Sequence, residues 1–280
     1  MKLKLKAHLR LAAEEGASTD WRDKYDSVGN FFKGLAVVKL NRKWGFVNVT
    51  GKVVIPLKYD RVGTFHSGLV VVYLNGKWGF VDKTGKEVVP VKYNEVWGFK
   101  KGLASVELNG KWGFVDKTGK EVVPPKYDRV GEFSEDPAPV GLNGQWGFID
   151  KTGKEVVPLN YQHVEYFREG LAGVQLNGRW GFINTEGEEV VPPKYDYVLH
   201  FRRGLAKVEL NGQCGVVDKT GKELLPCVYN EGKIPVKTLE EAIKLSNRIK
   251  KKYEQDPEGL ELTIPEFDWK SWYEQVTKSS

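Results

Sequence analysis

The chain of 280 residues contains only two cysteines, four histidines and one methionine, and it has no long apolar run. Cys214 and Cys227 are too few for a disulfide framework, so the composition favours a reduced, cytoplasmic setting. No apolar stretch approaches the roughly 20 residues that span a bilayer. The first residues alternate basic and apolar side chains and lack the apolar core of a signal peptide. We therefore expect a cytoplasmic protein without a membrane partner.

Signatures of catalysis are missing as well. The histidines and cysteines have no recognisable zinc spacing. The glycines are spaced for hairpins and do not form a phosphate-binding loop or a nucleophile elbow. We therefore predict that the protein is not an enzyme and has no catalytic residue, metal site, cofactor or small-molecule substrate. The histidines concerned are His8, His66, His163 and His200.

What the chain does contain is a Trp-Gly pair that returns every 34 residues. A tyrosine opens each copy, a valine follows three residues later, and a phenylalanine and a Gly-Leu pair come next. The fourth copy has Asp136-Pro137 in place of Gly-Leu. A fixed period of this length is typical of a repeat architecture. The tryptophans are Trp44, Trp78, Trp112, Trp146 and Trp180, and Cys214 occupies the sixth place.

Each copy is predicted to form four short strands, which in the second copy are residues 59–62, 69–74, 77–82 and 87–89. Asn75-Gly76 predicts a two-residue hairpin turn, because both residues accept positive φ. Asp82 is expected to accept amide hydrogens in the turn that precedes the fourth strand. Pro90 is expected to end that strand, because proline cannot donate to a ladder.

The recurring aromatic residues are interpreted as a shared core between adjacent copies, since one copy is too small to bury them alone. The alternative is a row of tryptophans that stack on sugars or bases. The glycine that follows each tryptophan is expected to mark a bulge or a close backbone approach. We expect this glycine to make room for a neighbouring ring.

The fold predicted for residues 21–232 is an all-β repeat array of six 34-residue β-meander units. We favour a propeller-like ring, because a seventh tyrosine, Tyr229, follows the last copy and could let the two ends complete one blade. The alternative is an open β-solenoid or superhelix, which needs no closure.

Two segments flank the array. Residues 1–20 alternate with period two and predict a strand extension with a basic face. Residues 233–280 predict an amphipathic helix ending near Gln255, an extended segment and a short terminal helix. Trp269, Trp272 and Tyr273 would share one face of that last helix. This face either docks on its own domain or anchors a partner.

The repeat unit GLVVVYLNGKWGFVDKTGKEVVPVKYNEV resembles the WG-repeat (KWG-repeat) proteins of bacteria. The similarity covers residues 21–229, and it is highly specific because turn, Trp-Gly pair and spacing agree in five copies. It implies a bacterial or phage origin and an array that presents a binding surface, and it brings no catalytic residue to this chain. The two flanking segments lie outside the resemblance.

The predicted function is a non-enzymatic binding module or scaffold that recruits a protein partner, with Trp269, Trp272 and Tyr273 as candidate contacts. The first alternative is an accessory protein that binds nucleic acid or a nucleoprotein complex. Lysines recur at one turn, as at Lys83 and Lys86, and could follow a phosphate backbone. The net charge of +6 permits such a partner but does not require one. The second alternative is a carbohydrate-binding repeat protein. Basic candidates in the tail are Lys250, Lys251 and Lys252.

Overall fold

A computed structural model describes residues 20–133, 135–230 and 239–256. The predicted strand in residues 1–20 lies outside this range except for Asp20, as do the extended segment and the aromatic helix predicted after residue 256. No helix in the described residues has the length and apolar character to span a bilayer. The chain divides into two compact units, each described by itself below. Unit 1 is Met1–Asn109 with Val115–Glu121, and unit 2 is Gly110–Phe114 with Val122–Ser280.

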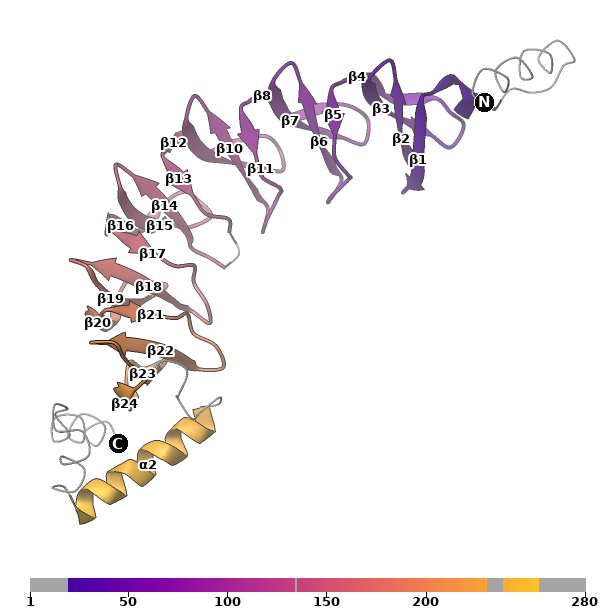
Figure 1. The fold of residues 1–280 in the computed structure, drawn as a ribbon. Coiled ribbons are helices and arrows are strands. Elements are labelled where there is room, and N and C mark those ends of the chain that lie inside the picture. The colour runs from indigo at the N-terminus through magenta and orange to yellow at the C-terminus, as the bar shows by residue number, and fades with distance from the viewer. Residues whose placement is uncertain (1–19, 134, 231–238, 257–280) are drawn as a thin grey trace, which may run out of the picture. The chain divides into compact units, whose positions relative to one another are not determined.

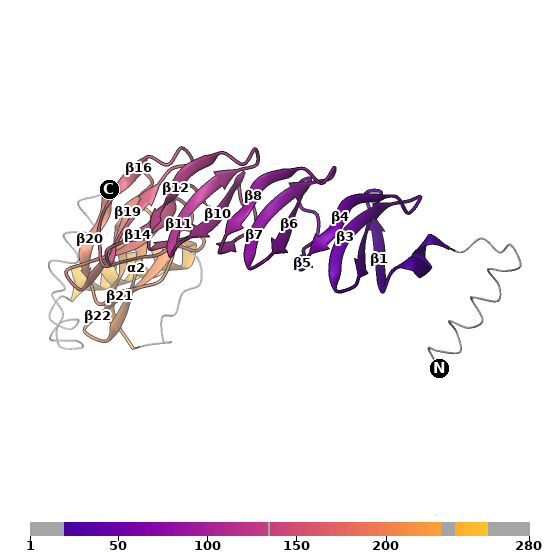
Figure 2. The ribbon, with the colours of Figure 1, turned by 90° about the horizontal axis from the view of Figure 1, so that it is seen from above.

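Six antiparallel sheets of four strands follow one another along the chain, and in each the strand order is the sequence order (Figures 1 and 2). The first sheet holds β1 (Ser27–Phe32), β2 (Leu35–Leu40), β3 (Lys43–Asn48) and β4 (Val53–Tyr59). The second holds β5 (Arg61–Val62), β6 (Leu69–Leu74), β7 (Lys77–Asp82) and β8 (Glu87–Tyr93). The third holds β9 (Glu95–Val96), β10 (Leu103–Leu108), β11 (Lys111–Asp116) and β12 (Glu121–Tyr127).

The remaining three sheets repeat this plan, and the C-terminal helix follows them. The fourth sheet holds β13 (Arg129–Val130), β14 (Ala138–Leu142), β15 (Gln145–Ile149) and β16 (Glu155–Tyr161). The fifth holds β17 (His163–Val164), β18 (Leu171–Leu176), β19 (Arg179–Asn184) and β20 (Glu189–Tyr195). The sixth holds β21 (Tyr197–Val198), β22 (Leu205–Leu210), β23 (Gln213–Asp218) and β24 (Glu223–Tyr229), before α2 (Leu239–Gln255).

The all-β repeat prediction is confirmed, with one open four-stranded sheet for each copy. The two hairpin strands, β6 and β7, have the predicted bounds. Asn75 and Gly76 have φ of 50° and 82°, as the predicted turn requires. The helix also ends at Gln255 as predicted. Closure of the array into a ring stays a prediction.

The prediction that Pro90 ends the fourth strand is wrong. β8 continues through Pro90 to Tyr93, which pairs with Trp78 of β7. β8 is an edge strand, where a proline that lacks an N–H can be accommodated without losing a ladder bond. The tyrosine that seemed to open a copy therefore closes the preceding sheet, and the first strand of each later sheet has only two residues.

The glycine after each tryptophan marks a bulge, as expected, because the register shifts between Trp78 and Phe80. The expectation that it makes room for a ring is wrong. A Cβ on Gly79 would lie 2.6 Å from the Val89 carbonyl oxygen and 2.8 Å from that of Pro90. Trp78 pairs with Tyr93 and Phe80 pairs with Val89, so the two residues of β7 lie beside a longer, bulged stretch of β8. The backbone of this bulge lies against Gly79, which has no side chain to obstruct it.

Phenylalanine and tyrosine side chains form the fully buried core. In unit 1, Phe80, Tyr93 and Val106 belong to one cluster, and in unit 2, Phe148, Tyr161 and Val174 belong to another. The repeat tryptophans are only half-buried, and Trp180 packs at the margin of a further cluster in unit 2. The core interpretation therefore holds for the phenylalanine of each Trp-Gly-Phe and for the tyrosine that closes each of the first five sheets, and only in part for the tryptophans.

The array begins and ends with different caps. Asp20 caps a short 3-10 helix, η1 (Trp21–Lys24), and the Trp21 ring lies where a Cβ on Gly51 would approach it to 2.3 Å. In the next copy the same glycine, Gly85, faces the backbone of Val54 in the preceding sheet. Trp21 therefore packs against the first sheet at the place where, in the next copy, the backbone of the preceding sheet packs. At the other end, α2 packs against β24 and buries Ala242 and Ser246.

Candidate functional site

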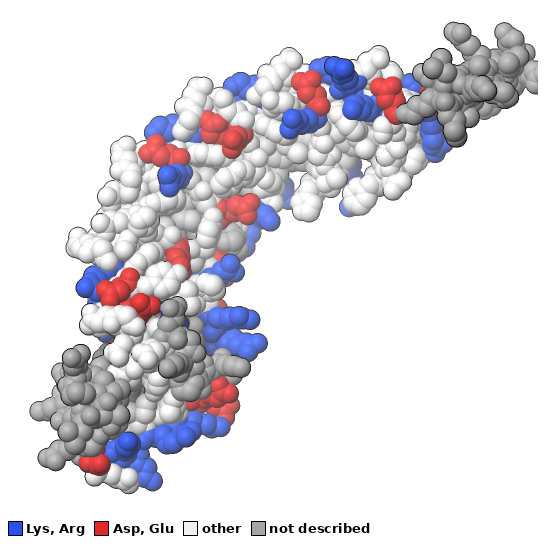
Figure 3. All heavy atoms as spheres, viewed as in Figure 1, with Lys and Arg blue, Asp and Glu red and all other residues white. Residues whose placement is uncertain are grey.

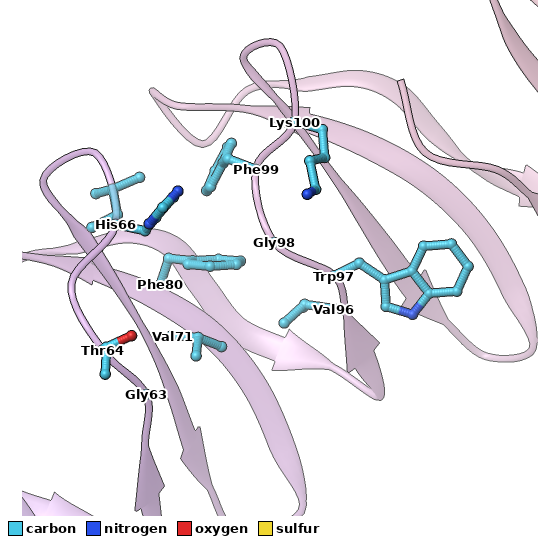
Figure 4. A pocket seen from close by; sticks show the side chains of 11 residues that line it. Gly63, Thr64, His66, Val71, Phe80, Val96, Trp97, Gly98, Phe99 and Lys100 are labelled. Atoms are coloured by element: carbon cyan, nitrogen blue, oxygen red, sulfur yellow. The ribbon is translucent and has the colours of Figure 1, made fainter. Parts of the chain in front are cut away.

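A pocket of about 370 Å³ lies in unit 1 between the loop that precedes β6 and the loop that precedes β10 (Figure 4). Figure 4 shows Phe80 at its centre, with His66 on one side and Trp97 on the other. This volume is within the range of about 300–1,000 Å³ that is typical of ligand pockets. The lining residues are Gly63, Thr64, His66, Leu69, Val71, Phe80, Val96, Trp97, Gly98, Phe99 and Lys100.

The floor of the pocket is a pair of phenylalanine rings from neighbouring sheets. Phe80 of β7 is 5% exposed, and its ring centroid lies 4.9 Å from that of Phe99 at an edge-to-face angle of 63°. Such pairs contribute about 0.5–1.5 kcal/mol beyond the burial of their area. The same pairing recurs in both units at every loop except the corresponding segment of the first copy, where Phe31 is 37% exposed and contacts Trp21. The other pairs are Phe46–Phe65, Phe114–Phe133, Phe148–Phe167 and Phe182–Phe201.

Around this constant phenylalanine the loop sequence changes from copy to copy. We call residues 63–68, 97–102, 131–136, 165–170 and 199–204 the variable loops; the corresponding residues 29–34 of the first copy include the end of β1. The third residue is phenylalanine in all six copies and the sixth is glycine in all but the fourth, whereas the others differ in size and charge. The first residue shows this best: it is Gly29, Gly63, Trp97, Gly131, Glu165 and Leu199 in turn.

In the first five copies the size of that first residue is matched by the residue opposite it, whereas in the sixth Leu199 lies opposite Lys207. The Gly63 N–H donates to the Val71 carbonyl at 2.9 Å, and the Trp97 N–H donates to the Ser105 carbonyl at the same distance. A Cβ on Gly63 would lie only 2.6 Å from Val71 Cγ1. A side chain is therefore excluded at residue 63, whereas the smaller Ser105 accommodates Trp97. The fifth copy has the same arrangement, with Glu165 opposite Gly173.

The rim of the pocket is basic. His66 and Lys100 occupy the fourth position of their loops and are exposed. Each begins a tight turn closed by paired backbone bonds, such as Lys100 N–H to the Leu103 carbonyl at 2.8 Å. None of the eleven lining residues carries a carboxylate. The pocket therefore combines an apolar floor with a cationic edge.

Unit 2 has a pocket of about 300 Å³ at the corresponding loops, with a different lining. Val164, Glu165, Tyr166, Arg168 and His200 form it. The Glu165 Oε2 atom is buried without a hydrogen-bond partner in the described structure, and burial raises the pKa of this carboxyl group. The two pockets share their place in the repeat and differ in charge.

The site residues predicted in the tail are only partly covered by the described structure. Trp269, Trp272 and Tyr273 lie outside it. Lys251 and Lys252 are exposed near the end of α2, whereas Lys250 is partly buried. Burial, reinforced by the nearby charge of Lys222, lowers the pKa of Lys250.

The recurrent aspartates have the structural role predicted for them. The Asp82 carboxylate accepts from Thr84 N at 2.8 Å, Thr84 Oγ1 at 2.7 Å and Lys86 N at 3.1 Å. The hydrogen bond from the Thr84 hydroxyl is the largest cause of its lowered pKa. In the described residues, no group of three or more His, Cys, Asp or Glu side chains could hold a metal ion.

The repeat pattern did not predict Trp97 as a site residue, although the sequence contains a signal for it. It is a tryptophan outside the Trp-Gly register, at a place where three other copies have glycine. Comparison of the copies at their variable positions would have identified the pocket loop.

Repeated four-stranded sheets with a constant core and variable loops define a β-repeat protein. The family model described as "WG containing repeat" matches residues 24–44, 44–78, 78–112, 112–146, 146–180 and 180–214. The chain therefore belongs to the WG-repeat family, as the resemblance of its repeat unit implies. A search of curated proteins gives no match.

Among solved structures, the chain is similar to several larger or comparable β proteins. Hsv2 of Kluyveromyces lactis, with loop 6CD replaced by a Gly-Ser linker, has 11% identity and a TM-score of 0.36, over 69% of this chain and 78% of that chain. Hsv2 of Kluyveromyces marxianus has 13% identity and a TM-score of 0.35, over 74% and 73%. PorZ of Porphyromonas gingivalis has 12% identity and a TM-score of 0.29, over 74% and 33%. At these scores the likeness carries no argument about closure or function.

Proposed function

We propose that the protein is a non-enzymatic binding module that recruits a protein partner through its variable loops. The observation that carries the proposal is the unit 1 pocket, where sequence variation concentrates around a phenylalanine base common to all copies. Loops held by a rigid scaffold are the usual place for binding residues. Trp97 is the principal anchor in this proposal, because tryptophan is enriched among residues that dominate binding energy. A cytoplasmic location, suggested by the low cysteine content, belongs to the same proposal.

Partner capture from the native host tests this proposal. The full chain is used as bait beside Trp97→Gly, which places the glycine of the first, second and fourth copies in the third. Leu199→Gly is the matched control, because Leu199 stands at the same loop position and is 40% exposed in unit 2. We expect one protein to be captured by the wild type and the control and lost with Trp97→Gly. Equal capture by all three baits contradicts the assignment to this pocket.

A nucleic-acid partner is the second candidate, and the exposed turn lysines favour it. Lys83, Lys86, Lys117 and Lys120 are all exposed. The neighbouring Glu87 and Glu121 pair with other lysines, Lys58 at 3.5 Å and Lys92 at 2.9 Å. Against this, Figure 3 shows acidic and basic side chains interspersed on the face in view.

A salt titration distinguishes the two candidates. Affinity for a generic duplex that falls steeply with salt would indicate that several lysines neutralise phosphates. Substitution of Lys83 and Lys117 by glutamine would then reduce the salt slope. No measurable duplex binding at about 0.05 M salt, where such contacts are strongest, excludes this candidate.

The tail is a further part of the proposal. Trp269, Trp272 and Tyr273, with Lys250, Lys251 and Lys252, are proposed to contribute to partner binding, on the ground that aromatic side chains at this spacing share a helical face. Replacing Trp269 and Trp272 by alanine should abolish capture and leave the thermal transition of the array nearly unchanged. A sharp fall in the transition temperature would place these side chains in the core instead.

A further inference from the structure

We propose that the unit 1 pocket binds an acidic peptide segment of the partner, with an aromatic or branched apolar side chain in the pocket and carboxylates against Lys100 and His66. This inference deepens the proposed function and rests on it. It names the chemistry of the partner at one site. The argument has three parts: the apolar floor, the charge of the rim and the open backbone beside it.

The floor selects an apolar side chain. Phe80 and Leu69 are almost fully buried, and Val71, Val96 and Phe99 complete the apolar lining. Trp97 forms the wall at the end away from His66 (Figure 4). A side chain that enters the pocket removes its own apolar surface and that of the lining from water, which favours binding in proportion to the area buried.

The rim selects negative charge beside that side chain. Lys100 lines the pocket, and the adjacent Lys101 is exposed as well. Within the described part of the chain, neither lysine is among the residues that form an ion pair, in contrast to Lys58 and Lys92. Carboxylates of a bound peptide would therefore gain charged hydrogen bonds without displacing an existing pair.

The unit 2 pocket shows that this charge is not a general property of the repeat. There the first loop residue is Glu165, whose buried carboxylate oxygen lacks a hydrogen-bond partner. Arg168 and His200 line the same pocket, so an acidic peptide would meet a carboxylate there as well as basic groups. The unit 1 pocket differs in that its lining holds Lys100 and His66 and no carboxylate.

The backbone at the rim suits a polypeptide. Gly98 is exposed, and no atom lies within 4 Å of the place where its Cβ would be. Glycine allows the main chain of a ligand to approach closely. The second residue of this loop thus gives an extended peptide access to the edge of the pocket.

Isothermal titration of the full chain with a synthetic peptide tests the inference. The probe is an acetylated and amidated Gly-Ser-Glu-Phe-Asp-Gly-Ser. One control peptide has glutamine and asparagine in place of the two acids, and another has alanine in place of phenylalanine. We expect saturable binding of the probe, and a loss of about tenfold or more with either control, as expected when charged contacts or a buried ring are removed.

Protein variants locate the binding. Trp97→Gly should abolish it, and Lys100→Gln should weaken it about tenfold, because a charged contact is lost. Lys101→Gln removes the same charge from the next residue, outside the lining, and should weaken binding less. Circular dichroism and the thermal transition of each variant establish that it is folded.

The outcomes separate this inference from the proposed function. The inference is overturned if the probe and the uncharged peptide bind equally, if Lys100→Gln and Lys101→Gln have equal effects, or if the folded wild type does not bind the probe. If the probe fails while capture of a host protein still depends on Trp97, the proposed function stands and the acidic peptide is excluded. If both fail, the pocket is not the recruiting site.

Discussion

Each repeat joins two regions of different character, as residues 63–68 and residues 69–82 show in the second copy. The hairpin of β6 and β7 keeps its turn and its Trp-Gly-Phe sequence in the next copy, whereas the variable loop keeps only its phenylalanine and its final glycine. Close backbone contacts restrict which residues the hairpin accepts, because a Cβ added to Gly79 would lie within 3 Å of atoms of the adjacent strand. The loop faces solvent or a pocket. The hairpin therefore builds the array, and the variable loop is available for recognition.

The largest effect should come from the phenylalanine that joins the two regions. Phe201 is 2% exposed, and its ring centroid lies 4.8 Å from that of Phe182. Phe201→Ala should reduce the free energy of unfolding by about 3–5 kcal/mol in urea denaturation. Leu199→Ala, two residues earlier and 40% exposed, should cost less than about 1 kcal/mol. Similar losses of stability in both variants would show that the buried phenylalanine and the exposed first residue of the loop do not differ in their contribution to the fold.

Glycine substitutions test the same comparison within unit 1. Gly79→Ala introduces a Cβ that overlaps the Val89 and Pro90 carbonyl oxygens, and should cost about 1–3 kcal/mol or more, since backbone must move. Gly98→Ala meets no atom within 4 Å and should change stability by less than about 0.5 kcal/mol. Thermal unfolding of the two variants measures the difference. A costly Gly98→Ala would show that the loop is constrained as the hairpin is.

A double-mutant cycle tests the size matching between loop and hairpin. Ser105 is 3% exposed and lies opposite Trp97, so Ser105→Val should destabilise by about 1–3 kcal/mol through overpacking. In a Trp97→Gly background the same change recreates the Gly63–Val71 pair of the preceding copy and should be tolerated. The expected coupling is about 1 kcal/mol or more. Additive effects would show that the two positions vary independently.

The smallest effect concerns pH. The lowered pKa values of Asp82, Asp116 and Asp150 mean that their stabilisation is complete above the ordinary value near 4 and is lost as pH falls through the lower folded values. Asparagine at all three should therefore reduce the loss of stability on acidification. Asn48 is a natural precedent, since its Oδ1 accepts the same turn bonds at 3.0 Å. Denaturant midpoints between about pH 5 and pH 2.5 measure the effect, and an unchanged acid profile would contradict it.

Local chemistry made much of the repeat predictable. The bounds of β6 and β7 and the positive φ of Asn75 and Gly76 follow from residues within a few positions of one another. The end of α2 was likewise marked by Asp256-Pro257 in the sequence. These features depend on propensity, turn chemistry and periodicity, which act over short distances along the chain.

The remaining features depend on contacts with residues that are distant in sequence or on the neighbouring strand. Only the folded chain shows that Tyr93 belongs to the preceding sheet and that Gly79 admits backbone rather than a ring. Trp97 was visible as an irregular tryptophan, but its place beside Phe80 and its match to Ser105 were not. The period, the hairpins and the family follow from residues that recur along the chain. Which variable residues meet in a pocket depends on how one sheet packs on the next, and the linear order of residues does not show this packing.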